Sequence, residues 1–158
     1  MQKITPYLWF DNQAEEAIRF YTSLFPNSRI VSISRLPGEA PGVDGAVLTA
    51  TFELNGREFM ALNGGPQFKF NESISLFVDC DSQEEVDRLW NALTADGGEE
   101  SQCGWLKDKY GLSWQIIPEA LMRLMSDPNA TKAGAVMQAM LQMQKIDVAT
   151  LQAAYDGA

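Results

Sequence analysis

Histidine is absent from all 158 residues of the chain. Its absence removes the commonest general base of enzymes, the histidine-based catalytic triads and every metal site that depends on imidazole. The sequence also contains neither a G-x-G-x-x-G pattern nor a Walker-type loop, so nucleotide cofactors lack a recognisable binding loop. Any site in this protein must therefore be built from other residue types.

Cysteine is scarce, since Cys80 and Cys103 are the only two. They form no C-x-x-C pattern and no disulfide framework, so reduced thiols in a cytoplasmic protein are the expected state. Cys80 follows an apolar strand face and is expected to be buried. Cys103 begins a predicted strand, and without a histidine to activate it we do not expect it to act as a nucleophile.

Long apolar runs and an excess of positive charge are also missing. No apolar stretch approaches the roughly 18 residues that a membrane-spanning helix needs, and residues 1–6 look like the lead-in to a strand rather than a signal peptide. The chain carries 12 lysines and arginines against 21 aspartates and glutamates, a net charge of -9. Such a surface repels phosphate backbones and anionic membranes. We therefore expect a cytoplasmic protein that binds neither nucleic acid nor membranes.

The first half of the chain predicts a strand, a helix and three further strands. The strands are predicted over residues 4–10, 29–36, 46–54 and 57–62, and an Asn55-Gly56 hairpin turn joins the last two. The helix follows Asp11-Asn12. Asn12 is expected to cap it, with Glu15 at the third helical position of a capping box.

The same order of elements then begins again. A strand is predicted over residues 73–78, a helix after Asp81-Ser82, and a hairpin with strands over 103–107 and 112–117. Asp11-Asn12-x-x-Glu15 is echoed by Asp81-Ser82-x-x-Glu85. Two unrelated capped helices would also explain this echo, but the repeated order of elements favours a duplicated βαβββ unit.

The predicted fold class is α+β, with two βαβββ modules forming curved mixed sheets around a cleft, plus C-terminal helices. We expect one domain, with modules over about 1–67 and 70–118 and a helical tail over 119–158. The tail helices are predicted over 119–125, 132–144 and 148–155, and they present a Met-rich face. Such a face can be an adaptable binding surface. We favour packing of the tail on its own domain or on a partner subunit, and we expect a homodimer.

Alternate residues of a strand face opposite ways, which gives each predicted strand an apolar face and a mixed face. The apolar face of the first strand holds Ile4, Leu8 and Phe10, and that of the fifth holds Ile74, Leu76 and Val78. Hydroxyls, an amide and rings gather on the mixed faces, at Thr5, Tyr7, Trp9, Ser73, Ser75, Phe77, Ser113 and Gln115, and aliphatic Ile117 shares the last of these faces. Large aromatic side chains are costly to leave in water, so we expect these faces to line a cleft for an uncharged or weakly polar ligand. Positions that face solvent or a dimer partner are the alternative.

The segment 103–118, CGWLKDKYGLSWQIIP, resembles the closing hairpin of the vicinal-oxygen-chelate superfamily. That superfamily includes glyoxalase I, extradiol dioxygenases, fosfomycin-resistance proteins and bleomycin-binding proteins. Segments 6–10, 16–21 and 143–147 resemble its demethylubiquinone methyltransferase-like branch. The resemblance implies one four-stranded sheet per module, each curved around a cleft, and a homodimer.

The resemblance also indicates where a metal would be held. Metal-dependent members use one ligand from each of four strands, mostly His and Glu. The corresponding positions here are Thr5 or Tyr7 in the first strand, a residue within 60–63 in the fourth, Ser73 or Ser75 in the fifth, and Gln115, four residues after Gly111, in the last. These residues are poor ligands for a transition metal, so we expect neither a metal nor another cofactor.

Two functions remain open. One is a metal-free protein that binds a small, partly apolar molecule in its cleft. The other is an enzyme of the demethylubiquinone methyltransferase-like or glyoxalase and dioxygenase type, acting on a small aromatic or carbonyl substrate through residues such as Tyr7, Asn63 and Gln115. The lack of an activated base, a nucleophile or an S-adenosylmethionine-binding glycine loop favours the first, and we assign no catalytic residue. The expected ligand-binding residues are Thr5, Tyr7, Trp9, Asn63, Ser73, Ser75, Phe77, Trp105 and Gln115.

Overall fold

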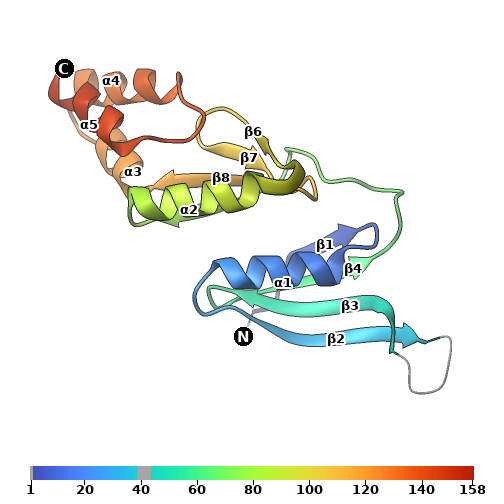
Figure 1. The fold of residues 1–158 in the computed structure, drawn as a ribbon. Helices are drawn as coiled ribbons and strands as arrows, with labels where there is room; N and C mark the ends of the chain where they lie inside the picture. The colour runs from blue at the N-terminus through green and yellow to red at the C-terminus, as the bar shows by residue number, and fades with distance from the viewer. Residues whose placement is uncertain (1, 39–43) are drawn as a thin grey trace. The chain divides into compact units, whose positions relative to one another are not determined.

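The computed structural model describes residues 2–38 and 44–158. The chain divides into two compact units, Met1–Phe70 and Asn71–Ala158. Each unit contains one four-stranded mixed sheet and repeats the order strand, helix, three strands (Figure 1). The α+β class and the duplicated βαβββ order predicted from the sequence are therefore confirmed.

The first unit is built from one helix and four strands. These are β1 (Tyr7–Phe10), α1 (Ala14–Leu24), β2 (Arg29–Pro37), β3 (Asp44–Leu54) and β4 (Arg57–Asn63). The sheet order is β1-β4-β3-β2, with β1 parallel to β4 and the other pairs antiparallel. Asn55 and Gly56 have φ values of 50° and 78°, as the tight hairpin turn between β3 and β4 requires.

The core of the first unit lies between α1 and one face of its sheet. The helix buries the predicted positions Ala14, Ala17, Ile18 and Tyr21. The sheet face beneath it buries Leu8, Phe10, Ala50, Phe52, Phe59 and Ala61. One predicted core position is wrong, because β1 begins only at Tyr7 and Ile4 ahead of it is 89% exposed.

The N-terminus of α1 is capped from a distant part of the chain. The predicted capping box is wrong: the N-cap residue is Gln13, its side chain makes no capping hydrogen bond, and Asn12 is exposed. Asn63, at the end of β4, replaces it, since its Oδ1 accepts a 2.9 Å hydrogen bond from the backbone N–H of Ala14. The amide of Asn63 also donates a 3.0 Å hydrogen bond to the carbonyl of Val47. One side chain thus ties the helix to two strands.

Substituting Asn63 should therefore cost more stability than substituting Asn12. We expect Asn63→Ala to lower the free energy of unfolding by about 1–2 kcal/mol, the usual range for a lost helix cap. Asn12→Ala is the matched control and should change it by less than about 0.5 kcal/mol. Urea denaturation of both variants gives the comparison, and equal losses would contradict the long-range cap.

The second unit repeats this plan and adds a tail. Its sheet has the order β5-β8-β7-β6, with β5 parallel to β8 and the other pairs antiparallel. Its first elements are β5 (Ser75–Cys80), α2 (Gln83–Thr94), a 3-10 turn (Ala95–Gly97), β6 (Glu99–Glu100), β7 (Trp105–Lys107) and β8 (Ser113–Pro118). The short strand β6 was not predicted. The fifth strand begins two residues later than predicted, so Ile74 lies outside it and is 71% exposed rather than buried.

The predicted start and buried stripe of α2 are confirmed. Ser82 is the N-cap, and its hydroxyl accepts a hydrogen bond from the backbone N–H of Glu85 at 3.2 Å. The carboxylate of Glu85 reaches back to the backbone N–H of Asp81 at 3.4 Å. The helix buries Val86, Leu89, Trp90 and Leu93 over the sheet residues Leu106, Trp114 and Ile116.

The turn between β7 and β8 is organised by a buried carboxylate. Asp108 is only 2% exposed. Its Oδ1 accepts hydrogen bonds from the backbone N–H groups of Tyr110, at 2.9 Å, and Leu112, at 3.1 Å. Its Oδ2 accepts a 2.9 Å hydrogen bond from the indole N–H of Trp114. The carboxylate therefore fixes both the turn and the large side chain of the strand that follows it.

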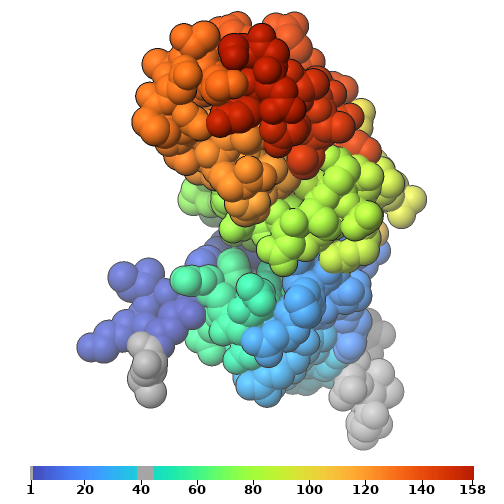
Figure 2. All heavy atoms as spheres, turned by 90° about the vertical axis from the view of Figure 1, so that its left-hand side faces the viewer, coloured from blue at the N-terminus to red at the C-terminus, as the bar shows by residue number. Residues whose placement is uncertain are grey.

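The tail packs on the second unit. This agrees with the first of the two predicted alternatives, packing on its own domain rather than on a partner subunit. It forms α3 (Glu119–Met125), α4 (Ala130–Met140) and α5 (Val148–Asp156), the orange and red elements of Figure 2. Its buried residues form one hydrophobic cluster with the end of β8: Ile117, Leu121, Leu124, Val136, Ile146 and Leu151. Within residues 2–38 and 44–158, no helix has both the length and the apolar character that crossing a membrane would take.

A strap of six residues, 143–148, joins the tail to both layers of the second unit. The carbonyls of Met143 and Gln144 each accept a 2.8 Å hydrogen bond, from the backbone N–H groups of Cys103 and Gly104. On the helix layer, the Gln83 amide donates to the carbonyl of Ile146 and accepts from the N–H of residue 148.

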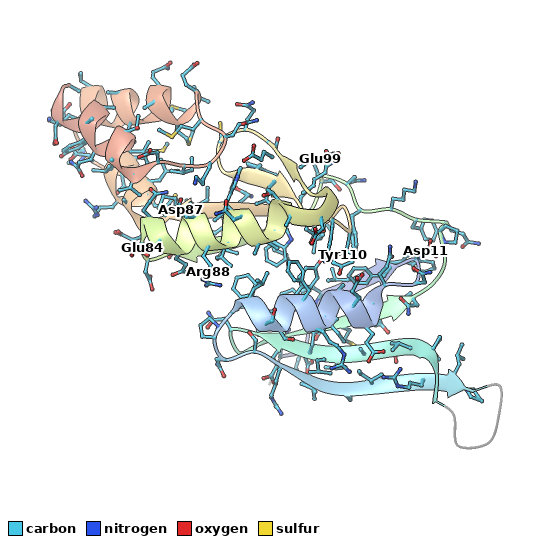
Figure 3. The ribbon with its side chains drawn as sticks, viewed as in Figure 1. Asp11, Glu84, Asp87, Arg88, Glu99 and Tyr110 are labelled. Atoms are coloured by element: carbon cyan, nitrogen blue, oxygen red, sulfur yellow. The ribbon has the colours of Figure 1, made fainter. Side chains whose placement is uncertain are left out.

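An ion pair between Lys145 of this strap and Asp87 of α2, 2.9 Å long, adds a further link. Asp87 lies on the side of α2 towards the tail, whereas Glu84 and Arg88 point to the other side (Figure 3).

Candidate functional site

The helix-free face of the first sheet carries two of the predicted site residues. Tyr7 and Trp9 lie on the side of β1 opposite to buried Leu8 and Phe10, as strand alternation predicted. Tyr7 is 47% exposed, and Trp9 is partly buried. Thr5 precedes the strand, and its hydroxyl lies 3.5 Å from the carboxylate of Glu58. This face therefore presents one open aromatic ring and a second ring that is partly covered.

The ring of Trp9 is covered by the segment that follows β4. Its indole N–H donates a 2.9 Å hydrogen bond to the carbonyl of Gly65, and Phe68 meets it edge-on with centroids 5.0 Å apart. Gly64 leaves no room for a side chain there, since a Cβ atom would lie 2.3 Å from the ring. Trp9 thus has a packing role of its own, and substituting it should disturb folding as well as any ligand.

Asn63, by contrast, does not share this face. Its side chain lies on the α1 side of the sheet, where both ends of its amide bond backbone groups of Ala14 and Val47. The fold alone accounts for this residue, and we do not carry it into the proposal below.

The face of the second sheet opposite to α2 brings four predicted residues together, and the tail helices cover its Ile117 end. Phe77 of β5, Gln115 of β8 and Trp105 of β7 are direct neighbours across three strands. The amide N–H of Gln115 donates a 2.9 Å hydrogen bond to the hydroxyl of Ser75 on the adjacent strand. Phe77 is 52% exposed and Trp105 is partly buried. The result is a polar pair flanked by two aromatic rings.

Ser73 lies outside this group. It precedes β5, and both its backbone N–H and its hydroxyl bond the side chain of Asn71 in a local turn, at 2.9 and 2.6 Å. The strand begins at Ser75 instead, which leaves Ser75 as the serine of the candidate site.

Ser113 belongs to the same face and was not among the predicted ligand-binding residues. It lies directly between Ser75 and Lys107 across the sheet and is 1% exposed. Its hydroxyl has no hydrogen-bond partner within the described part of the chain. Alternation with Gln115, two residues later, already placed it on this face, and that spacing was the signal that could have identified it.

The charged groups beside this face include one ion pair and two acidic residues, Glu99 opposite Lys107 and Asp79 on β5. Lys107 forms an ion pair with Glu72. The hydrogen bond to Lys107 lowers the pKa of Glu72, and the same contact raises the pKa of Lys107. Both groups therefore stay charged near neutral pH, and together they add no net charge to the face.

The residues at the expected metal positions do not suit a transition metal. Ser75 and Gln115 are neutral and hydrogen-bonded to each other, whereas zinc and iron prefer imidazole, thiolate or carboxylate donors. Across residues 2–38 and 44–158, no three His, Cys, Asp or Glu side chains gather into a possible metal site. Burial raises the pKa of the Cys80 thiol to about 12, so this sulfur is neither a ready nucleophile nor a thiolate ligand.

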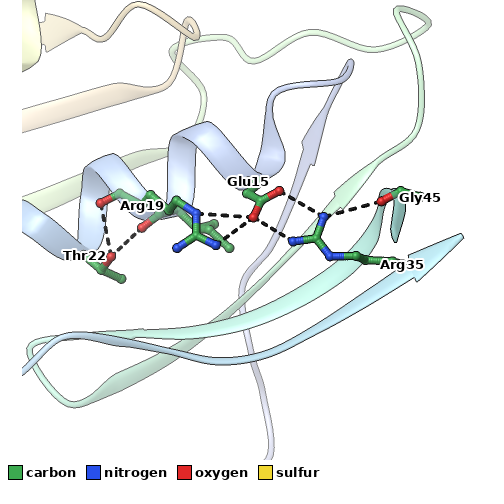
Figure 4. A network of polar contacts seen from close by, with 6 residues as sticks. Glu15, Arg19, Thr22, Arg35 and Gly45 are labelled. Carbon is green, nitrogen blue, oxygen red and sulfur yellow. Dashed lines mark hydrogen bonds and ion pairs between the residues drawn. The ribbon is translucent and has the colours of Figure 1, made fainter. Parts of the chain in front are cut away.

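A cluster of ion pairs lies in the helix layer of the first unit (Figure 4). Glu15 of α1 pairs with Arg19 at 2.7 Å and with Arg35 of β2 at 2.8 Å. Arg35 also donates a hydrogen bond to the carbonyl of Gly45 at 3.4 Å. The hydrogen bonds from Arg35 and Arg19 lower the pKa of Glu15 from 4.5 to about 2. Glu15 thus ties the helix to β2 instead of capping it, and Arg35 continues the link to β3.

The lowered pKa of Glu15 predicts a pH-dependent contribution to stability. The unfolded chain takes up a proton at this carboxyl near pH 4.5 and the folded chain only near pH 2. The stabilisation is therefore complete above about pH 4.5 and is lost as the pH falls towards 2. We expect wild type to be more stable than Glu15→Gln at neutral pH and the gap to close below pH 4.5, measured by urea denaturation at each pH. Glu16→Gln, an exposed neighbour, is the control, and a gap that is constant with pH would contradict the prediction.

Comparison with known proteins gives a consistent family. The family model described as 3-demethylubiquinone-9 3-methyltransferase matches residues 2–117. A PhnB protein from Bacillus cereus, assigned by name to the 3-demethylubiquinone-9 3-methyltransferases, is 44% identical; the match covers 74% of this chain and 99% of that one, with a TM-score of 0.67. No protein with a curated description matched the chain.

Two more distant structures show the fold alone. PA1353 from Pseudomonas aeruginosa is 24% identical over 75% of this chain and 98% of its own, with a TM-score of 0.57. The fosfomycin resistance protein FosX from Mesorhizobium loti is 12% identical over 72% of this chain and 90% of its own, with a TM-score of 0.50. The family match ends at residue 117, so segment 143–147, which the sequence resemblance included, lies outside it.

Proposed function

The chain belongs to the 3-demethylubiquinone-9 3-methyltransferase-like (PhnB) family, whose structural relatives share the glyoxalase fold, and from this premise we propose that it binds a small, partly apolar molecule without a metal. The observation that carries the proposal is the row Phe77–Gln115–Trp105 on the face of the second sheet opposite to α2. The cleft expected from the sequence stays a prediction.

The physical argument starts from the exposed ring. Phe77 is 52% exposed at the outer strand of the sheet, and with partly buried Trp105 two residues across the row it forms an apolar patch of the kind that marks binding surfaces. The amide of Gln115 beside it is held in place by Ser75 at 2.9 Å. A few fixed polar groups among apolar side chains are what small-molecule sites use to orient a ligand.

Binding rather than catalysis fits the residue types. The chain has no histidine, and burial raises the pKa of the Cys80 thiol to about 12. General acid–base or covalent catalysis needs a group poised near neutral pH. The hydroxyls and the amide of this face orient a ligand and do not meet that need.

The test is a ligand screen on untagged protein, by native mass spectrometry for a co-purified molecule and by NMR for added fragments. We expect bound molecules to shift the signals of Phe77, Trp105 and Gln115, and Trp105→Ala to weaken binding at least tenfold. Gln138→Ala, at an exposed position of α4, should leave binding unchanged. Ligands that bind wild type and Trp105→Ala equally would refute the proposed face.

Absence of a transition metal is part of the proposal and has its own test. Elemental analysis of dialysed, untagged protein should find no stoichiometric zinc, nickel or iron, because neutral oxygen and amide groups bind these ions weakly. A His-tag must be avoided, since it supplies the missing imidazoles. One equivalent of metal per chain, lost in Gln115→Ala, would overturn the metal-free function.

We also propose that the protein is a cytoplasmic homodimer. Support for a partner subunit comes from apolar side chains that the tail leaves exposed, Met122 at 56% and both Met137 and Leu141 at 44%. Light scattering at micromolar concentration should give twice the mass of the 17.5 kDa chain. A mass of one chain would contradict the dimer.

A further inference from the structure

We infer that the face of the second sheet opposite to α2 selects an uncharged aromatic ring that carries a hydrogen-bond donor and an acceptor side by side, as an aromatic carboxamide does. This inference rests on the proposed function and names the ligand class of the same face. Three features carry it: the spacing of the two rings, the unused hydrogen-bonding groups between them, and the balance of charge.

The spacing of the rings suits one guest ring. Phe77 and Trp105 are each the direct cross-strand neighbour of Gln115, on opposite sides of it. Adjacent strands lie about 4.8 Å apart, so the two aromatic residues stand roughly 10 Å apart. Aromatic pairs prefer centroid separations of about 4.5–7 Å. A single planar ring above Gln115 can therefore contact both aromatic side chains.

The polar groups between the rings, Gln115 and Ser75, can bind a ligand that offers a hydrogen-bond donor and an acceptor together. The N–H of Gln115 is used by Ser75, and within the described residues its Oε1 has no donor and the Ser75 hydroxyl has no acceptor. A ligand N–H can therefore bond Gln115 Oε1 while a ligand oxygen accepts from Ser75. A primary carboxamide places these two groups on one carbon atom.

Ser113 adds an unmet hydrogen-bond requirement beneath the same pair. Its hydroxyl is buried next to Ser75 and is unpaired among the residues that the structure describes. A buried polar group without a partner costs about 1–3 kcal/mol. Such groups are rare in folded proteins and call for an explanation. A polar ligand atom or a water molecule held by the ligand would supply the missing partner.

The charge balance disfavours ionic ligands. Lys107 is neutralised by Glu72, and two further charges on this face are acidic: Glu99, directly across from Lys107 on β6, and Asp79, two positions beyond Phe77 on β5. A carboxylate ligand would meet no free cation here, and a net charge of -9 would repel it. Moving a charged group from water onto neutral hydroxyls and an amide loses more solvation than those groups return.

The experiment compares four matched fragments by protein-observed NMR titration of the untagged full chain. The fragments are benzamide, benzoate, benzylamine and cyclohexanecarboxamide. We expect benzamide to bind at least tenfold more tightly than benzoate or benzylamine, and several-fold more tightly than the non-planar amide. The signals that move should include the Gln115 amide and the Trp105 indole.

Two substitutions at one position sharpen the test. Gln115→Leu should remove the preference for benzamide, and Gln115→Glu should shift it towards benzylamine; a thermal melt checks that both variants fold. If wild type prefers benzoate or benzylamine, or binds all four fragments equally, the inference about the ligand class is wrong. The proposed function still stands in that case, because a ligand is bound at this face. Failure of all four, with another screened ligand bound at the face, also overturns the inference alone. No ligand of any kind at the face overturns both.

Discussion

Asp108→Ala should lower the free energy of unfolding by about 4 kcal/mol, the range seen when a buried charged acceptor leaves its partners unpaired. The side chain is 2% exposed and accepts three hydrogen bonds, from two backbone N–H groups and from the indole of Trp114. The substitution leaves these three N–H donors without an acceptor in a buried site. It also releases the turn that sets β8 against β7.

Urea denaturation monitored by tryptophan fluorescence measures this loss. Asp79→Ala removes an exposed aspartate from the same unit and should change stability by less than about 0.5 kcal/mol. Asp108→Asn keeps the shape and loses less than Asp108→Ala, because an amide can still accept from the backbone but faces the indole N–H with a donor. A loss below about 1 kcal/mol for Asp108→Ala would show that the turn is not organised by this carboxylate.

The features predicted correctly from the sequence are those with local causes. Strand alternation separated Tyr7 and Trp9 from buried Leu8 and Phe10 because neighbouring residues of a strand face opposite ways. The Asn55-Gly56 turn and the Ser82 cap depend on residues at most three positions apart.

The features predicted wrongly depend on partners far along the chain. Asn63 caps α1 across 49 positions of sequence, and nothing near Asn12 shows that its place is taken. Exposed Ile74 looked like a strand residue because its apolar spacing continues that of Leu76 and Val78.

Only the part of the candidate site that depends on local strand alternation was predictable from the sequence. Alternation placed Phe77 and Gln115 on mixed faces, but pairing them requires the register of β5 with β8, which lie some 40 positions apart. Ser73 was included because the start of a strand is poorly marked, and the observed start two residues later leaves it in a turn. Alternation with Gln115 also placed Ser113 on this face, but the burial of its unpaired hydroxyl is visible only in three dimensions.

The tail lies outside the family match but inside the hydrophobic core of the second unit. The match ends at residue 117, yet Ile117 itself is buried in a cluster with tail residues of α3, α4 and α5. The strap 143–148 also bonds Cys103 and Gly104, directly ahead of Trp105 in β7. The tail is therefore part of the structure that holds the proposed ligand face.

Ile146→Ala tests this dependence, and we expect it to lower the free energy of unfolding by about 3–4 kcal/mol, as a buried Ile-to-Ala change does when the cavity cannot collapse. Ile146 is fully buried, and it packs so close to Gly104 that a Cβ atom there would lie 3.2 Å from it. Loosening it should free the strap and shift the NMR signals of Gly104 and Trp105 as well as those of the tail. Gln138→Ala, at an exposed position of α4, removes a tail side chain without opening a cavity and should do neither. If Ile146→Ala costs under about 1 kcal/mol and leaves the Trp105 signal in place, the tail is an appendage that the ligand face does not need.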